Sequence, residues 1–220
     1  MDFKALYDNP VTATLLPCAY ALATALVALR TKQAGSTSPS FVRVYGLVFA
    51  LTTAADAYLN GGWSPLKEGS DLQTAASVTF VIVGDFRYFV VLEEASDHAL
   101  KLVRAVVLAF VVPVSMQVIR ASVPNVKNDL ALTFLVYEVL FFAFALGLLL
   151  FTVKRSRDVT LARRATVFEL VQYAVWIAAD VGLLTTHEPA FWALRELANL
   201  LYYVACVPLM MHLLARRRMN

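Results

Sequence analysis

A stripe of polar side chains follows one face of an apolar run near residues 164–185. Its members are Glu169, Gln172, Tyr173, Trp176 and Asp180, which stand at positions i, i+3, i+4, i+7 and i+11. This spacing places all five on one face of a helix. An ionisable group costs about 2.5–3.5 kcal/mol at the centre of a bilayer on insertion scales. The stripe is therefore expected to face protein or water, and its members are candidates for a functional site.

Other apolar runs carry similar polar residues at helical spacing. The run 41–60 has Thr52, Asp56 and Asn60 at i, i+4 and i+8. The other candidates are Asp85, Arg87 and Tyr88 in run 73–93, Glu138 in run 129–153, and Arg195, Asn199, Tyr202, Tyr203 and Cys206 in run 190–214. We expect three to five helices to direct these groups into one interior that is open toward the outer side, with Asp85 and Arg87 at its floor.

The same residues also have a structural interpretation. An intramembrane Asp or Glu can pair with Arg87 or Arg195, or bond a tyrosine hydroxyl, and such interactions average about 0.6 kcal/mol each. Glu93 and Glu94, with Asp97, are expected at a membrane boundary in contact with solvent. The Phe141–Phe144 segment is expected to face lipid or the protein core.

Several kinds of site are not supported by the residues present. Residues 190–214 contain no Lys that could form a retinal Schiff base. The three histidines, His98, His187 and His212, are scattered near the ends of apolar runs, so we expect no metal site and no haem. We also expect no other cofactor. Any chemistry must depend on carboxylates, tyrosines and water.

The elements that position these residues are expected to be membrane-spanning helices. Of 220 residues, 60% are hydrophobic and 16% are charged, which is far more apolar than a soluble domain. Seven runs have the length of about 20 residues that spans a bilayer: 11–30, 41–60, 73–93, 100–119, 129–153, 164–185 and 190–214. The sequence therefore predicts an all-α fold, with residues 1–220 forming a single transmembrane domain of seven bundled helices.

The orientation follows from the distribution of Lys and Arg. Thirteen lie at one set of run ends and four at the other, while Arg87 and Arg195 lie inside runs. The larger group comprises Arg30, Lys32, Arg43, Lys101, Arg104, Lys154, Arg155, Arg157, Arg163, Arg164 and Arg216 to Arg218. This predicts an outside amino terminus and a cytoplasmic carboxyl terminus. Because the cations sit at span ends, no nucleic-acid partner is expected.

Three short motifs occur in the order seen in a known family. They are Ala54-Ala55-Asp56-Ala57-Tyr58-Leu59, Ala178-Ala179-Asp180-Val181-Gly182-Leu183-Leu184 and Leu201-Tyr202-Tyr203-Val204-Ala205. Together they resemble the Gly-Asp, Ser-Asp and Tyr-Tyr span motifs of the lysoplasmalogenase-like (YhhN) membrane family. The family usually has eight spans, so this chain would lack the first. It also has Ala55 where the family favours Gly, and no His before Tyr88.

The resemblance implies hydrolysis of the vinyl ether bond of lysoplasmalogens, with release of a fatty aldehyde. Asp56 and Asp180 would then be the catalytic carboxyls, one as proton donor and one as ionised base. The implied substrate-binding residues are Asn60, Asp85, Arg87, Tyr88, Glu138, Trp176, Arg195, Asn199, Tyr202 and Tyr203. The partner would be a membrane lipid or lysophospholipid, in a bacterial inner membrane or an endoplasmic reticulum. A seven-helix transporter or receptor and a structural membrane partner are the alternatives.

Overall fold

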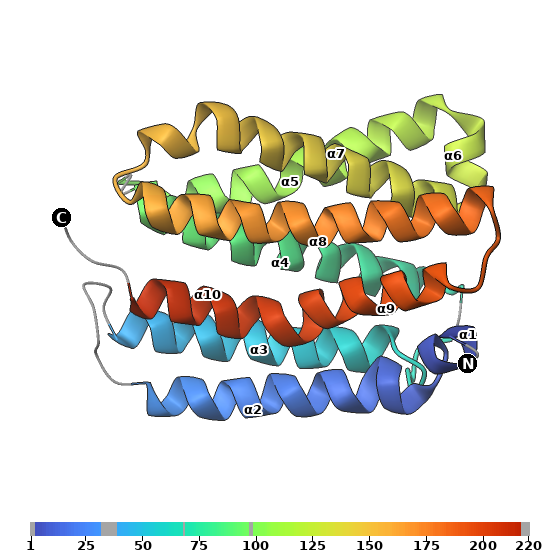
Figure 1. The fold of residues 1–220 in the computed structure, drawn as a ribbon, viewed down its shortest axis with the longest axis horizontal. Coiled ribbons are helices and arrows are strands. Elements are labelled where there is room, and N and C mark those ends of the chain that lie inside the picture. The colour runs from blue at the N-terminus through green and yellow to red at the C-terminus, as the bar shows by residue number, and fades with distance from the viewer. Residues whose placement is uncertain (1–2, 32–38, 68, 97–98, 217–220) are drawn as a thin grey trace. The chain divides into compact units, whose positions relative to one another are not determined.

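The structure is a computed structural model that describes residues 3–31, 39–67, 69–96 and 99–216 (Figure 1). Lys32, Asp97, His98, Arg217 and Arg218, all considered above, lie outside this range. The described residues are helical apart from their short connections. The longer helices are α2 (Leu16–Arg30), α3 (Pro39–Asn60), α4 (Asp71–Ser96), α5 (Lys101–Ser122), α7 (Leu130–Phe151), α8 (Val159–Thr185), α9 (Phe191–Leu200) and α10 (Cys206–Ala215).

Short elements extend or join these helices: α1 (Phe3–Tyr7), η1 (Val11–Leu15), α6 (Pro124–Asn128), η2 (Val153–Arg155) and η3 (Leu201–Ala205). Within the described part of the chain, seven continuous helical stretches are long and apolar enough to cross a membrane. They are Val11–Arg30, Ser40–Asn60, Asp71–Ser96, Lys101–Ser122, Leu130–Arg155, Val159–Thr185 and Phe191–Ala215. The predicted seven-span, all-α architecture is confirmed, and the chain is an integral membrane protein.

The contacts divide the chain into two compact units. The first, here called the α5–α8 unit, comprises residues 1–4 and 88–198. The second, the α2–α3–α10 unit, comprises residues 5–87 and 199–220. The division passes through α4, between Arg87 and Tyr88, and through the end of α9, between Ala198 and Asn199. Each unit therefore receives part of the same two helical spans.

In the α2–α3–α10 unit, α3 packs against both α2 and α10. The approach is close at Gly46 of α3, where an added Cβ would meet Ala28 of α2 and the Met211 side chain of α10. A larger residue at position 46 would push these helices apart. Small residues at such interfaces are how membrane helices gain van der Waals contact without a hydrophobic driving force.

In the α5–α8 unit, α7 packs against α8 and α5. Aspartates cap the starts of α7 and α8: Asp129 accepts the Leu132 N–H at 3.1 Å and Asp158 accepts the Leu161 N–H at 2.9 Å. Each side chain satisfies a backbone donor that the first helical turn leaves without a partner. These caps fix where α7 and α8 begin.

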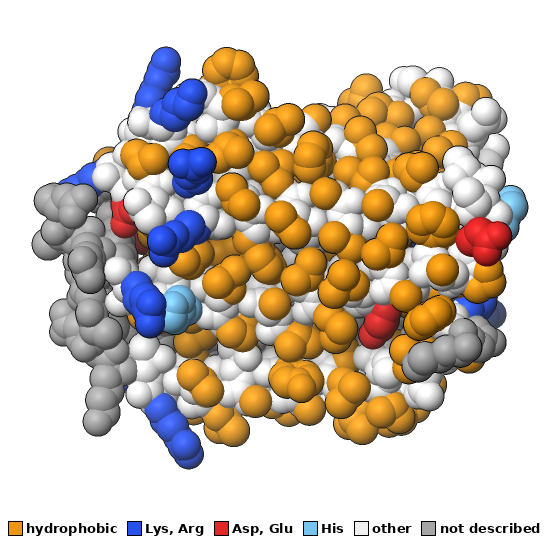
Figure 2. All heavy atoms as spheres, viewed as in Figure 1, with side chains coloured by type: hydrophobic (Ala, Val, Ile, Leu, Met, Phe, Trp, Pro, Cys, Tyr) orange, Lys and Arg blue, Asp and Glu red, His pale blue; other side chains and the backbone are white. Residues whose placement is uncertain are grey.

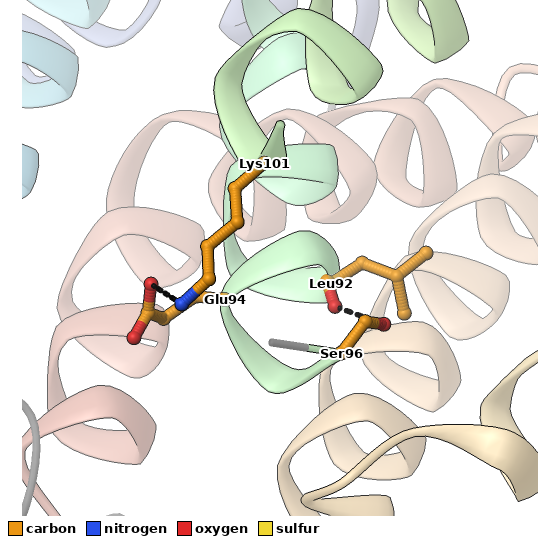
Figure 3. A network of polar contacts seen from close by, with 4 residues as sticks. All are labelled: Leu92, Glu94, Ser96 and Lys101. Carbon is orange, nitrogen blue, oxygen red and sulfur yellow. Dashed lines mark hydrogen bonds and ion pairs between the residues drawn. The ribbon is translucent and has the colours of Figure 1, made fainter. Parts of the chain in front are cut away.

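The corner between α4 and α5 is held by two ion pairs. Lys101 Nζ lies 3.1 Å from Glu94 Oε2 (Figure 3), and Arg104 Nε lies 3.0 Å from Glu93 Oε2. Glu93 is only 2% exposed, so the expectation that it is solvated was wrong. Its arginine partner explains how a carboxylate is accommodated there. Also in Figure 3, the Ser96 hydroxyl donates to the Leu92 carbonyl.

The helices carry apolar side chains on their exposed faces (Figure 2). On α5, for example, Val103, Val107, Val114 and Val118 are all exposed. In water such surfaces would be costly, whereas in a bilayer they are in contact with hydrocarbon. This pattern agrees with the span assignment.

Two spans contain a wider, π-helical turn. In η3 the Cys206 N–H bonds the Leu201 carbonyl, five residues back, and in η1 the Leu16 N–H bonds that of Val11. A proline follows each turn closely: Pro17 is two residues after the end of η1, and Pro208 is three residues after the end of η3. Proline has no N–H to continue the regular pattern, so the preceding turn widens. The turn η3 carries Tyr202 and Tyr203.

Candidate functional site

Asp56 is the centre of a polar cluster inside the α2–α3–α10 unit. It is 5% exposed, and its Oδ1 accepts a 2.7 Å hydrogen bond from Asn60 Nδ2, one helical turn further along α3. The Ser77 hydroxyl of α4 donates in turn to Asn60 Oδ1 at 2.7 Å. This chain of hydrogen bonds joins α3 to α4 and orients the carboxyl group. A buried carboxyl with such partners has a fixed position.

The two tyrosines of η3 lie beside the same carboxyl group. Tyr202 and Tyr203 both bring their hydroxyls within hydrogen-bonding reach of Asp56. The Tyr202 hydroxyl also donates to the Phe80 carbonyl at 3.4 Å, and its ring meets α4 at Gly84, where an added Cβ would touch the hydroxyl and the ring. Gly84, which has no side chain, thus leaves space on α4 for the Tyr202 ring.

Arg87 supplies a positive charge to this cluster. Its guanidinium carbon lies 4.0 Å from the centre of the Tyr202 ring, and its charge acts on Asp56. The Arg87 side chain is 2% exposed, and its backbone carbonyl accepts the Tyr45 hydroxyl at 3.2 Å. A cation over an aromatic face gains about 0.5–2 kcal/mol, more when it is desolvated. Asp85, also buried, acts electrostatically on Tyr202.

A small cavity opens among these residues. Its volume is about 10 Å³, about the space that one water molecule requires. The lining residues are Phe49, Thr52, Thr53, Asp56, Phe80, Val83, Gly84, Arg87 and Tyr202. The wall thus combines a carboxyl group, a guanidinium and hydroxyl groups. This is an arrangement in which a water molecule or another small polar group can be held next to Asp56.

The α5–α8 unit has a second polar cluster around Asp180. Asp180 of α8 is 1% exposed and forms an ion pair with Arg195 of α9. Glu138 of α7 is 6% exposed, and the charges of both partners act on it. Among the described side chains, Glu138 Oε2 and Asp180 Oδ2 are buried oxygens with no hydrogen-bond partner. Close packing of the Phe191 ring on Gly182 holds α9 against α8 beside this ion pair.

Aromatic residues fill the interior next to this second cluster. The Tyr173 ring stacks on Phe141 with centroids 4.2 Å apart, and Trp176 meets Tyr173 edge-on at 5.4 Å. The Tyr88 hydroxyl lies 2.9 Å from Thr166 Oγ1. Because the Thr166 hydroxyl donates to the Ala162 carbonyl at 2.7 Å, Tyr88 is the donor to Thr166. Glu169 is buried and acts electrostatically on Tyr88.

The polar stripe expected on α8 is confirmed as a face directed into protein. Glu169, Gln172, Tyr173 and Asp180 are buried, and Trp176 is partly so. The structural interpretation of Arg195 as an ion-pair partner also applies, because it binds Asp180. Phe141 of the aromatic segment is a core residue.

The expected site residues are divided between the two units. Asp56, Asn60, Asp85, Arg87, Tyr202 and Tyr203 belong to the first cluster, and Asn199, half-buried, lies in the same α2–α3–α10 unit. Tyr88, Glu138, Trp176, Asp180 and Arg195 belong to the α5–α8 unit. The joint action of Asp56 and Asp180 on one substrate stays a prediction.

Some partners in these clusters were not identified from the sequence. Ser77, Thr53 and Thr166 all contribute hydroxyls to the two sites. One signal was present: Ser77 and Gly84 stand seven residues apart in run 73–93, on one helical face. Such small residues mark a face that approaches another helix.

Comparison with known proteins adds no relative. No protein-family model, no curated protein and no solved structure matches this chain. The functional argument therefore depends on the chemistry of the two clusters.

Proposed function

We propose that the chain is a membrane-embedded hydrolase of lipid substrates in which the Asp56 carboxyl acts at the cleaved bond. The observation that carries this proposal is the position of Asp56 on the wall of a water-sized cavity. Arg87 and Tyr202 line the same cavity. Hydrolysis needs a positioned water and an acid–base group at the same place. A buried, hydrogen-bonded carboxyl meets the second requirement.

The more specific proposal is cleavage of the vinyl ether bond of a lysoplasmalogen, which follows from the motifs around Asp56, Asp180 and Tyr202. A proton from one carboxyl would add to the vinyl carbon and leave an oxocarbenium ion. Water would then add to this ion and give its proton to the second, ionised carboxyl. The resulting hemiacetal separates into a fatty aldehyde and the free hydroxyl of the glycerophospho head group. The host membrane would be a bacterial inner membrane or the endoplasmic reticulum.

The proposal is tested with purified protein in nanodiscs and a 1-alkenyl lysophospholipid. Aldehyde release is measured through NADH consumption by a coupled alcohol dehydrogenase, with the 1-alkyl ether analogue as the unreactive control substrate. We expect Asp56→Asn to lower the rate about 100-fold or more, the scale of general acid–base catalysis. Asp71→Asn, at the exposed start of α4, is the matched control and should keep the rate. Absence of aldehyde from the unmodified protein contradicts the proposal.

A transporter or receptor without catalysis is the second candidate. It is favoured by the size of the cavity, about 10 Å³, which suits a water molecule or small ion better than a lipid chain. Solute-dependent flux in proteoliposomes, lost in Asp56→Asn and without any aldehyde, would support this candidate over the hydrolase.

A further inference from the structure

The connection between α7 and α8 carries a dense set of exposed cations. Its members are Lys154, Arg155, Arg157, Arg163 and Arg164, all exposed, and we call them the basic turn. Residues 152–164 contain these five cations and one acid, Asp158, so their formal charge is +5 − 1 = +4. In Figure 2, Lys and Arg side chains gather at this end of α7 and α8.

The basic turn is anchored to the protein by its backbone and small side chains. The Asp158 N–H donates to the Ala95 carbonyl at 2.9 Å, and the Ser156 and Ser96 hydroxyls lie 3.3 Å apart. Val153, at the start of the turn, is buried at 1% exposure. The cations therefore project from a backbone with a fixed path, so that little backbone entropy is lost when a ligand is bound.

The neighbouring acids are already engaged. Asp158 accepts the Leu161 N–H as the cap of α8, while Glu93 and Glu94 pair with Arg104 and Lys101. The charges of Glu93 and Glu94 are thus compensated at the α4–α5 corner. The exposed charge of the basic turn remains strongly positive.

The place of the turn determines what can meet this charge. It joins two membrane-spanning helices, so it lies at the surface of the bilayer. Arg163 and Arg164, in the second turn of α8, can extend along the helix toward the head groups. We propose that the basic turn binds the head groups of anionic phospholipids, with the guanidinium groups contacting lipid phosphates. This inference does not depend on hydrolysis.

The test is a titration of the solubilised full chain with phosphatidylglycerol and, in parallel, with zwitterionic phosphatidylcholine, followed by native mass spectrometry. We expect a clear preference for phosphatidylglycerol that weakens with added salt. Each cation near an anionic surface is worth about 1 kcal/mol, or about five-fold, so R163Q/R164Q should weaken phosphatidylglycerol binding about 25-fold.

Two matched variants complete the experiment. K67Q/K127Q removes the same charge at exposed positions elsewhere and should bind phosphatidylglycerol like the unmodified chain. R163K/R164K keeps the charge and should retain most of the binding, which separates a charge effect from a folding defect. Equal binding of the two lipids, unchanged binding by R163Q/R164Q, or an equal loss in K67Q/K127Q would overturn the proposal.

Discussion

Asn60 donates a 2.7 Å hydrogen bond to the carboxylate of Asp56 one turn away on α3, and it accepts the Ser77 hydroxyl of α4 through its other side-chain atom. The amide thus links two spans and positions the candidate catalytic group. A residue that can both donate and accept is required at this point, since neither Leu nor Asp would satisfy both neighbours.

Replacing Asn60 by Leu should destabilise the protein by about 1–3 kcal/mol, because the buried Asp56 carboxyl loses its Asn60 hydrogen bond. Asn60→Gln, which keeps both functions on a longer side chain, should cost less. Unfolding in mixed micelles with increasing denaturing detergent measures the difference. If Asn60→Leu unfolds like the unmodified chain, the hydrogen-bonded link between α3 and α4 is not contributing as we infer.

Removing the cation from the buried pair Asp180–Arg195 should be costly. Arg195→Gln leaves the Asp180 carboxylate without its partner, and losing one member of a buried pair costs about 3–5 kcal/mol. The double variant Asp180→Leu with Arg195→Leu should recover much of this loss, because no unpaired charge remains. The same unfolding assay applies to all three proteins, and a double variant less stable than the single one would contradict the expectation.

Gly84→Ala should disturb the first cluster directly. The new Cβ would meet the Tyr202 hydroxyl and ring, so the tyrosine must move away from Asp56 at a cost of about 1–3 kcal/mol. Gly147→Ala on α7 is the matched control, since an added Cβ there meets nothing within 4 Å. The control should be neutral or stabilised by up to about 1 kcal/mol through helix propensity. Melting temperatures of the two variants, measured side by side, check this difference.

The Tyr88–Thr166 hydrogen bond predicts an asymmetry between two conservative substitutions. Tyr88→Phe removes a donor while Thr166 still bonds the Ala162 carbonyl, so a loss of about 1 kcal/mol is expected. Thr166→Val instead leaves the hydroxyl of the fully buried Tyr88 without its acceptor, at a cost of about 1–3 kcal/mol. Unfolding free energies of both variants decide the order, and a larger loss for Tyr88→Phe would reverse our donor assignment.

The orientation predicted from Lys and Arg can be tested with a fluorescent protein fused after Asn220. A carboxyl terminus in the cytoplasm should give fluorescent cells, and a periplasmic alkaline phosphatase fusion at the same position should be inactive. The opposite pair of results would place the thirteen cations outside.

The spans were predictable because bilayer thickness and hydropathy alone specify them. The predicted run 164–185 lies inside the observed span Val159–Thr185, and the run 11–30 coincides with Val11–Arg30. The polar stripe of α8 was predictable for a similar reason, since a helix with Glu169 and Asp180 on one face cannot turn that face to lipid.

Pairwise contacts were less accessible to sequence reasoning. Glu93 was expected in solvent, yet it is buried against Arg104, a residue eleven positions later on the next helix. The spacing of Ser77 and Gly84 indicated a contact face, but the pairing of Ser77 with Asn60 depends on the register of α4 against α3. Such registers depend on how small residues pack against neighbouring helices, as Gly84 does against Tyr202. Hydropathy does not describe this packing.

The wide turn η3 follows closely in the sequence after the division between the two units, which falls between Ala198 and Asn199. A π-helical turn takes up one more residue than an α-helical turn, so deleting one residue within Leu201–Ala205 would close the wide turn into a regular α-helix. The span would stay long and apolar enough to cross the membrane, but Tyr202 and Tyr203 would lose the wide turn that now carries them, while Arg195 stayed with Asp180. A single deletion here therefore alters the first cluster and leaves the second intact. It does so without any change in how the chain enters the membrane.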